Sequence, residues 1–446
     1  MFEHPNTEES RTPDAEESRT EDRGGESGQV TILVVFGALA FVLLIALVYN
    51  TAKQTSRKIE MQGAADSAAV ATGVWMARGM NLTALNNNTM VEMLSIMITV
   101  RAILQTEQIL HNALTALLIV PYVGEEAEFE LGCVEFAMSL WEGIDETLNS
   151  PGGVGWDVLT GLDSFNQGIK QSFPYLLEYE ATNYANLNGA DRWPYAWVFP
   201  GKSGGLPVFP LARGPRNLLV TKAQECALRM FGPLRWMATA ATFCGPISIF
   251  LGAMFINVRI DRNIQSLLGH SVFYDRFITG WGDIVKEILE EVLHIKLGPF
   301  SDLLGFLGNL AGSIPLIDPP LTPSLQWEAD VRPMLLTDEP DAELTENESP
   351  NLVKVHEYLQ LLAVALGKSQ RASPIGGEKF ANPDLLPRVT YAQADVYNPT
   401  RWDMFTQDWR AKLTRARLLD VKCRELGQKI GVGSLCGQGW SFVNTH

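Results

Sequence analysis

Five cysteines are the residues of this chain best suited to chemistry, because a thiolate can be a nucleophile, a metal ligand or half of a disulfide. No two of them form a CxxC pair, so their spacing predicts neither a zinc site nor a thioredoxin-like redox site. Cys423 and Cys436 could close a small disulfide loop if they lie outside the cytoplasm, since disulfides persist in oxidising compartments. The alternative is that all five are buried thiols. The full set is Cys133, Cys226, Cys244, Cys423 and Cys436.

The histidines have no metal-ligand spacing, and no HExxH motif occurs. No Ser/His/Asp pattern and no acidic metal loop stands out in the sequence. We therefore predict no catalytic, cofactor-binding or metal-ligating residues, and a protein that is not an enzyme. An anchored extracytoplasmic enzyme is the alternative, because a sequence does not show which side chains meet in space. The histidines concerned are His111, His270, His294, His356 and His446.

Segment 201–205, GKSGG, partly matches the phosphate-binding loop GxxxxGK[ST], but the first glycine of that motif would fall at Ala196. Without that glycine, and without a strand-to-helix context, we expect no nucleotide site. The net charge of −16 and the pI near 4.9 argue against nucleic-acid binding, which requires a basic face.

An uncharged stretch near the N-terminus is long enough to cross a membrane. From Val30 to Tyr49 the residues are uncharged and almost all apolar. Twenty residues at about 1.5 Å rise span roughly 30 Å, the thickness of the hydrocarbon core of a bilayer. We predict a transmembrane helix over residues 28–50, with an interfacial aromatic at Tyr49. Residues 1–27 are polar and mostly acidic, so we predict a disordered acidic tail.

Residues 51–120 are predicted to form Ala/Met-rich stem helices, with the first continuing the membrane helix. Three consecutive Asn residues within segment 81–88 favour a turn, so we expect a helical hairpin. Small side chains on one helical face allow another helix to approach closely. That helix would be either the chain's own Met-rich helix or the stem of another subunit. The candidate helix-packing interface comprises Ala64, Ala68, Ala71, Met93 and Met97.

The apolar span, the charged link after it and the box Gly63–Ala69 (GAADSAA) resemble the N-terminal segment of the TadE/TadG-like family. Members of that family are membrane-anchored proteins of bacterial Tad (Flp-type) pilus assembly. The resemblance extends weakly through segment 77–81, ARGMN, where similar proteins carry Ala-Arg-x-x-Asn, and through segment 391–399, YAQADVYNP. It implies a protein that assists assembly or anchoring of a pilus or related secretion apparatus. The implied partners are the membrane and other apparatus proteins, with a homo-oligomer through the stem as one arrangement.

The resemblance also bears on processing and orientation. Pilins cut by prepilin peptidase are cleaved after a glycine and carry a glutamate five residues later. Here the cut would follow Gly28, and the fifth residue after it is Leu33. We therefore expect an uncleaved, anchored protein of the TadG kind. The resemblance implies a single-pass protein of the inner (cytoplasmic) membrane whose large domain, after Asn50, lies outside the cytoplasm, whereas the Lys and Arg counts on the two sides are tied.

Residues 121–446 are predicted to form an extracytoplasmic, helix-rich domain with irregular loops and a few strands. The chain as a whole is therefore expected to be mostly α, of the α+β class. Segment 236–258 is uncharged and long enough to span a membrane, which keeps a multi-span scaffold as an alternative. Further expectations are helices over 125–147, 353–365 and 402–417, two helices within 277–310, a strand over 388–396, and turns throughout 151–168.

Overall fold

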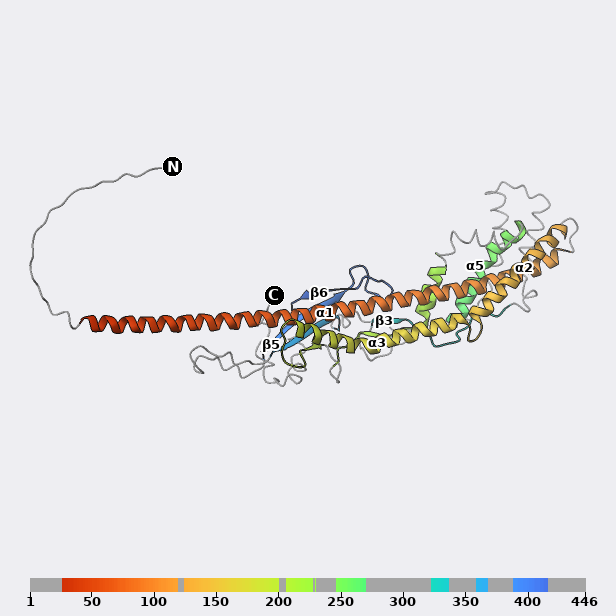
Figure 1. Ribbon diagram of the computed structural model, residues 1–446. Coiled ribbons are helices and arrows are strands. Elements are labelled where there is room, and N and C mark those ends of the chain that lie inside the picture. The colour runs from red at the N-terminus through yellow and green to blue at the C-terminus, as the bar shows by residue number, and fades with distance from the viewer. Residues whose placement is uncertain are drawn as a thin grey trace, which may run out of the picture. The chain divides into compact units, whose positions relative to one another are not determined.

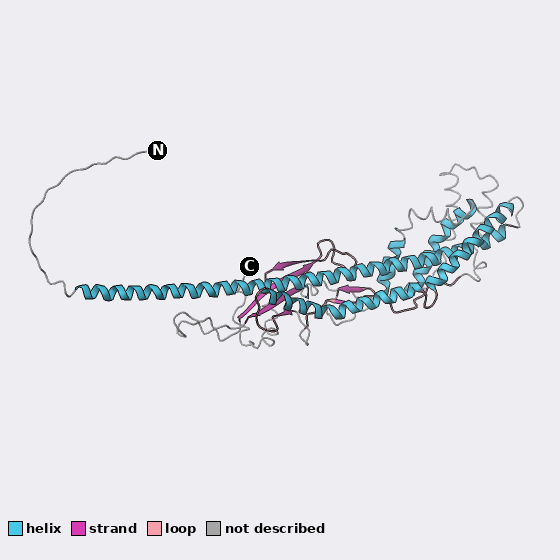
Figure 2. Cartoon of the chain, in the orientation of Figure 1, coloured by secondary structure: helices cyan, strands magenta, loops and turns pink. Residues whose placement is uncertain are grey.

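A computed structural model describes residues 26–118, 124–199, 206–227, 229, 246–269, 322–336, 358–367 and 388–415. The helices are α1 (Glu26–Leu117), α2 (Gly124–Asn149), α3 (Val154–Leu187) and α5 (Pro246–Leu268), and residues 216–227 are also helical (Figure 1). The strands are β1 (Ala196–Phe199), β2 (Leu211–Arg213), β3 (Met334–Leu336), β4 (Gln360–Gly367), β5 (Arg388–Tyr397) and β6 (Arg410–Thr414). Helix predominates in the described part of the chain (Figure 2). The predicted fold class, mostly α of the α+β class with a few strands, is confirmed: the described chain is mostly helical, with a long N-terminal apolar helix and small antiparallel sheets.

The chain divides into two compact units: residues 1–60 with 368–388, and residues 61–367 with 389–446. In the first unit, α1 exposes its large apolar side chains from Val30 to Tyr49. Among the described residues, this is the one helix long and apolar enough to cross a membrane. The packing described below lies within the second unit.

Helix α1 continues without interruption through segment 81–88, so the predicted hairpin turn is wrong. Asparagine is a weak helix former because its amide competes for nearby backbone groups. Here the amides are engaged with distant segments instead, as the contacts of Asn81 and Asn87 show. The stem is thus one helix, and its apolar face is buried by other elements of the fold.

Helices α2 and α3 run antiparallel to α1. Arg101 of α1 pairs with Asp145 of α2, with 2.7 Å between Nε and Oδ1. Further back along α1, the Asn86 amide donates to the Leu162 carbonyl of α3 over 2.7 Å. From Asn86 to Arg101 along α1, the contacted residue moves back in sequence from Leu162 to Asp145. Contacts that run in opposite directions along the chain indicate an antiparallel arrangement.

A four-stranded sheet of order β1-β4-β5-β6 packs on the middle of α1. Strand β1 pairs antiparallel with β4, placing Ala196 opposite Ala365, and β5 pairs antiparallel with β6, placing Val396 opposite Ala411. Side chains alternate between the two faces, as the period of a strand requires. One face contributes to the core around α1, and the other carries the second buried cluster of Phe199, Leu362, Val364 and Tyr391.

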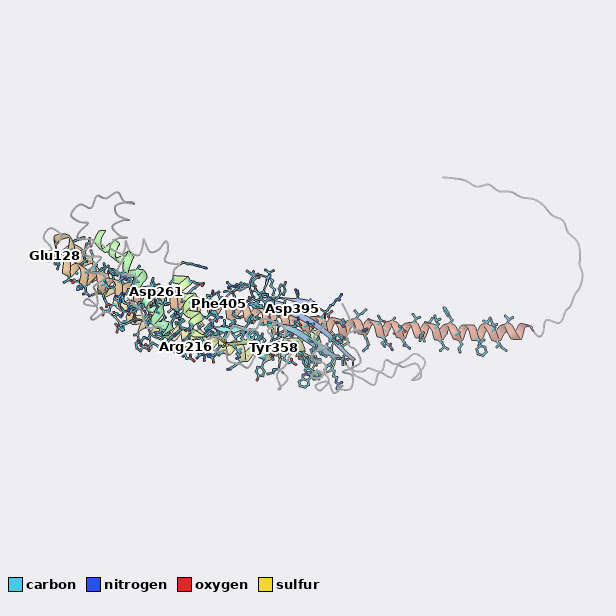
Figure 3. The ribbon with its side chains drawn as sticks, turned by 180° about the vertical axis from the view of Figure 1, so that it is seen from behind. Glu128, Arg216, Asp261, Tyr358, Asp395 and Phe405 are labelled. Carbon is cyan, nitrogen blue, oxygen red and sulfur yellow. The ribbon has the colours of Figure 1, made fainter. Side chains whose placement is uncertain are left out.

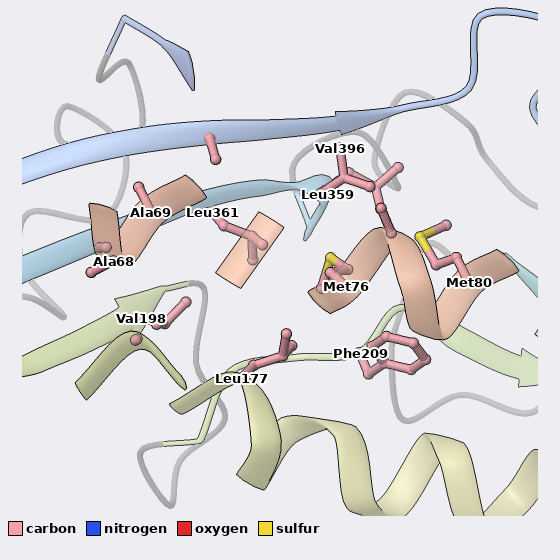
Figure 4. Close-up of a cluster of buried hydrophobic side chains, with 14 of the residues drawn as sticks. Ala68, Ala69, Met76, Met80, Leu177, Val198, Phe209, Leu359, Leu361 and Val396 are labelled. Atoms are coloured by element: carbon pink, nitrogen blue, oxygen red, sulfur yellow. The ribbon is translucent and has the colours of Figure 1, made fainter. Parts of the chain in front are cut away.

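The main core joins the alanines and methionines of α1 to α3 and to this sheet (Figure 4). Helix and sheet approach closely at Gly73, where an added Cβ would lie 3.0 Å from the Cβ of Ala411 and 3.1 Å from that of Ala394. A separate core surrounds Met97 and Trp156, with residues of α5 packed against them. The second core includes Ile256, Ile260 and Ile264, so this stretch of α5 is amphipathic and faces the protein interior.

The helix over 125–147 and the strand over 388–396 are confirmed as α2 and β5. The turn-rich reading of 151–168 is wrong for most of that stretch, which forms the start of α3. Helices were expected over 353–365 and 402–417, but residues 360–365 belong to β4 and residues 410–414 form β6, because pairing with neighbouring strands outweighs weak local helical patterns. The helices within 277–310 and residues 236–245 of the candidate second span lie outside the described residues.

Candidate interaction surface

The box Gly63–Ala69 has one face directed into the protein core. Ala64, Ala65, Ala68 and Ala69 are fully buried in the cluster that includes α3 and the sheet. Small side chains are required there because the α1 backbone lies close to its neighbours. Ala68 and Ala69 face this cluster in Figure 4. The alanine face is therefore in contact with the chain's own α3 and strands.

The opposite side of the same helical stretch lines an open groove of about 430 Å³. Residues spaced by three and four positions lie on one side of a helix, which explains why Asp66, Val70 and Val74 line it together. Tyr184 of α3 also lines the groove, which therefore involves both helices. The complete lining is Asp66, Ser67, Val70, Ala71, Val74, Trp75, Arg78 and Tyr184.

The polar groups of this groove are held in position by contacts on α1 and β5. The guanidinium of Arg78 lies 4.8 Å from the centroid of the Trp75 ring, within cation–π range. The Gln62 amide donates to Asp66 Oδ1 over 2.9 Å and to the Tyr391 carbonyl over 3.2 Å. The groove thus combines an apolar floor with an acidic and a basic side chain.

Further along α1, asparagine amides hold distant segments of the chain. Asn87 Nδ2 donates to the carbonyls of Met334 and Met404, and Asn87 Oδ1 accepts from the Met334 N–H. Asn88 donates to the Phe405 carbonyl over 2.7 Å. Because these amides satisfy buried backbone groups, they connect β3 and the loop before β6 to the helix.

A charged cluster connects α3, β2 and the segment before β3. Arg213 lies 3.1 Å from both Asp163 and Asp330, and Arg216 and Arg332 also pair with Asp330. Burial raises the pKa of Asp163, although the charge of Arg213 opposes this effect. Partial burial acts to raise the pKa of Asp330, but the Arg332 hydrogen bond and the surrounding arginines lower it. Each carboxylate is engaged by guanidinium groups, so the cluster is a structural connection.

Glu107 is the most perturbed carboxyl group among the described residues. It is fully buried on α1, and neither of its carboxylate oxygens has a hydrogen-bond partner among the described residues. Desolvation raises its pKa to about 8. Within the described residues, no group of three or more His, Cys, Asp or Glu side chains could hold a metal ion. Glu107 is therefore an isolated buried acid in this part of the chain.

The structure places the candidate site residues in different environments. Ala64 and Ala68 belong to the main core, and Ala71 is also buried. Met97 is buried in the second core and Met93 packs against that core, both further along the same helix. The two methionines are therefore not opposite the alanines. Cys423 and Cys436 lie outside the described residues, as do His270, His294, His356, His446 and segment 201–205. Cys133 and Cys226 are half-buried.

Sequence reasoning did not identify Trp75, Arg78 and Tyr184 as members of one surface. A partial signal was available, because segment 77–81 extends the family pattern and contains both Arg78 and Asn81. Tyr184 carries no such signal. It follows Arg78 by more than 100 positions and joins the groove only because α3 folds back along α1.

Comparison with known proteins gives one assignment. Residues 28–75 match the Tad family model, described as putative Flp pilus-assembly TadE/G-like. No curated protein and no solved structure significantly matches the chain. The matched segment contains the apolar stretch Val30–Tyr49, the buried alanine face and most of the α1 side of the groove. Residues 28–75 of this chain are therefore assigned to the TadE/G-like (Tad) family.

Proposed function

We propose that this chain is a single-pass, membrane-anchored protein that assists assembly or anchoring of a Tad/Flp-type pilus or a related secretion apparatus. It acts through protein–protein contacts and catalyses no reaction. The observation that carries this proposal is the family match over residues 28–75. The exposed apolar side chains from Val30 to Tyr49 support the anchor, because such a surface is stable in lipid and costly in water.

The groove beside the box is the surface that we assign to other apparatus proteins. Trp, Tyr and Arg are enriched at protein interfaces, and the groove contains Trp75, Tyr184 and Arg78 around an apolar floor. The buried alanine face fixes this part of α1 within the fold, so the groove is preformed and binding does not have to order it.

The test compares two matched variants in a strain that lacks the chromosomal copy. Val70 lines the groove and Ile96 lies elsewhere on α1, and the two side chains are almost equally exposed, at 37% and 38%. Val70→Arg should reduce the number of pili seen by electron microscopy, whereas Ile96→Arg should restore it as wild type does. Both variants should remain in the membrane after carbonate extraction. Equal piliation by the two variants would show that the groove is not the surface that binds other apparatus proteins. Normal piliation in the strain without the protein would contradict the proposed function.

Orientation and processing are tested on the same membranes. Protease applied to intact spheroplasts should degrade the chain after Asn50, since the proposed arrangement places that part outside the cytoplasm. Intact-mass measurement should find residues 1–28 retained, because Leu33 occupies the position where processed pilins carry glutamate. Protection of the large domain would reverse the orientation, and a mature chain starting at Gln29 would identify a processed pilin-like protein.

A further inference from the structure

Helix α2 carries an apolar stripe that the described fold leaves exposed. Phe129, Phe136 and Leu140 are 69%, 75% and 55% exposed, respectively. Other positions of α2, including Val134 and Ala137, are buried. Large apolar side chains concentrated on one exposed helix face are typical of a protein interface.

The spacing along this stripe resembles one side of a helix–helix seam. Together with Gly132 and Gly143, the three large side chains fall within an arc of about 80° at 100° per residue, over a length of about 21 Å. An added Cβ at either glycine would meet nothing within 4 Å. The seam therefore alternates projecting side chains with gaps, which is the pattern by which one helix packs against another.

Charge decides which kind of helix fits. Glu128, Glu142 and Glu146 are exposed along one edge of the seam, and Glu135 lies on the same edge, 3.4 Å from His111 Nε2. Figure 3 marks Glu128 on α2, at the end of the second unit remote from Asp395 of β5. Helix α2 contains no Lys, Arg or His, so a second copy of α2 offers no cation to these carboxylates. Like charges across a helix pair are destabilising.

We propose that the seam Phe129–Gly132–Phe136–Leu140–Gly143 binds an amphipathic helix of a partner protein whose apolar stripe is flanked by Lys or Arg. Apolar side chains of that helix would bury the two phenylalanines and Leu140, and its cations would lie beside the acidic edge. The apolar contact supplies affinity, and charge complementarity selects the partner and its register. Because α2 lies outside residues 28–75, this inference does not rest on the proposed function.

The probe is a synthetic helical peptide with a leucine stripe flanked by lysines, compared with the same stripe flanked by glutamates. Binding is measured by fluorescence anisotropy to the full-length protein in nanodiscs of zwitterionic lipid, with empty nanodiscs as reference. The lysine peptide should bind more tightly, and added salt should weaken it. Phe136→Ala should weaken binding by about tenfold or more, as expected for a central interface aromatic. Tyr179→Ala, at an exposed aromatic of α3, should change it by less than about twofold.

A charge reversal separates the acidic edge from the apolar contact. The double variant Glu128→Lys/Glu142→Lys leaves Glu135 and Glu146 beside two lysines, so it should lose the preference for the lysine peptide. Absence of peptide binding would overturn the proposal, as would equal losses in Phe136→Ala and Tyr179→Ala. Equal affinity for both peptides would contradict the proposal that the partner helix is basic. A dimer of the chain that is lost in Phe136→Ala, seen by mass photometry without peptide, would make a second copy the occupant and also overturn it.

Discussion

The side-chain amide of Asn81 on α1 exchanges two hydrogen bonds with the backbone of Trp409, which directly precedes β6. Asn81 Nδ2 donates to the Trp409 carbonyl over 3.0 Å, and Asn81 Oδ1 accepts from the Trp409 N–H over 2.9 Å. The two residues are 328 positions apart. One amide thus positions the edge strand of the sheet against the long helix.

Asn81→Ala should destabilise the second unit by about 1–3 kcal/mol, because it leaves a backbone donor and an acceptor without partners. Thermal unfolding followed by tryptophan fluorescence measures this loss. Asn188→Ala is the control, since that amide is exposed and donates only to the nearby Tyr184 carbonyl. An equal loss in the two variants would mean that the Trp409 contact has no special importance.

Two glycines of α1 should respond in opposite ways to alanine. At Gly79 a Cβ would lie 2.5 Å from the Phe173 ring and 2.8 Å from the Phe209 ring, so Gly79→Ala should cost about 1–3 kcal/mol through overpacking. At Gly63 a Cβ meets nothing within 4 Å, so Gly63→Ala should stabilise by up to about 1 kcal/mol through helix propensity. Denaturant midpoints compare the two variants. Stabilisation by Gly79→Ala would contradict the close packing.

Glu107 predicts a pH dependence of stability. Its pKa is about 8 in the folded chain against 4.5 as the ordinary value. Below pH 4.5 the carboxyl is protonated in both the folded and the unfolded chain, so its titration does not lower the free energy of unfolding. Between the two values the unfolded chain ionises first, so the free energy of unfolding falls by about 1.4 kcal/mol per pH unit from this group and levels off above pH 8.

Glu107→Gln should remove this contribution. Urea unfolding at several pH values should show the variant less sensitive to pH than wild type, and more stable than wild type at pH 9. Glu142→Gln, at an exposed position on α2, is the control and should leave the pH profile unchanged. Identical profiles for Glu107→Gln and wild type would mean that the carboxyl gains solvent or a partner in solution.

The buried pair Arg101–Asp145 should show strong coupling. Both side chains are over 90% buried, and Arg101 also donates to the Pro323 carbonyl over 3.0 Å. Arg101→Met should cost about 3–5 kcal/mol, because it leaves the Asp145 carboxylate buried without its counter-charge. The double variant Arg101→Met/Asp145→Leu should recover part of this loss. Strictly additive effects in the double-mutant cycle would show that the two charges do not interact.

The sequence alone determined the features that depend on local composition and period. The apolar stretch Val30–Tyr49 had to be a long helix whose side chains favour an apolar surrounding, and the box Gly63–Ala69 pointed to the matched family. Strand β5 was visible as an alternating pattern over 388–396. These signals come from neighbouring residues, so no knowledge of distant contacts was needed.

Tertiary structure decided the rest, because distant partners changed the balance of local preferences. Asn87 lies inside a helix since its amide binds Met334 and Met404, which no local pattern reveals. Residues 410–414 form a strand because β5 provides backbone partners that outweigh a helical period. The groove depends on Tyr184 meeting Val70 and Trp75 through the return of α3 along α1. Such a meeting is set by the packing of whole elements, and for that reason the surface could be assigned only in the folded chain.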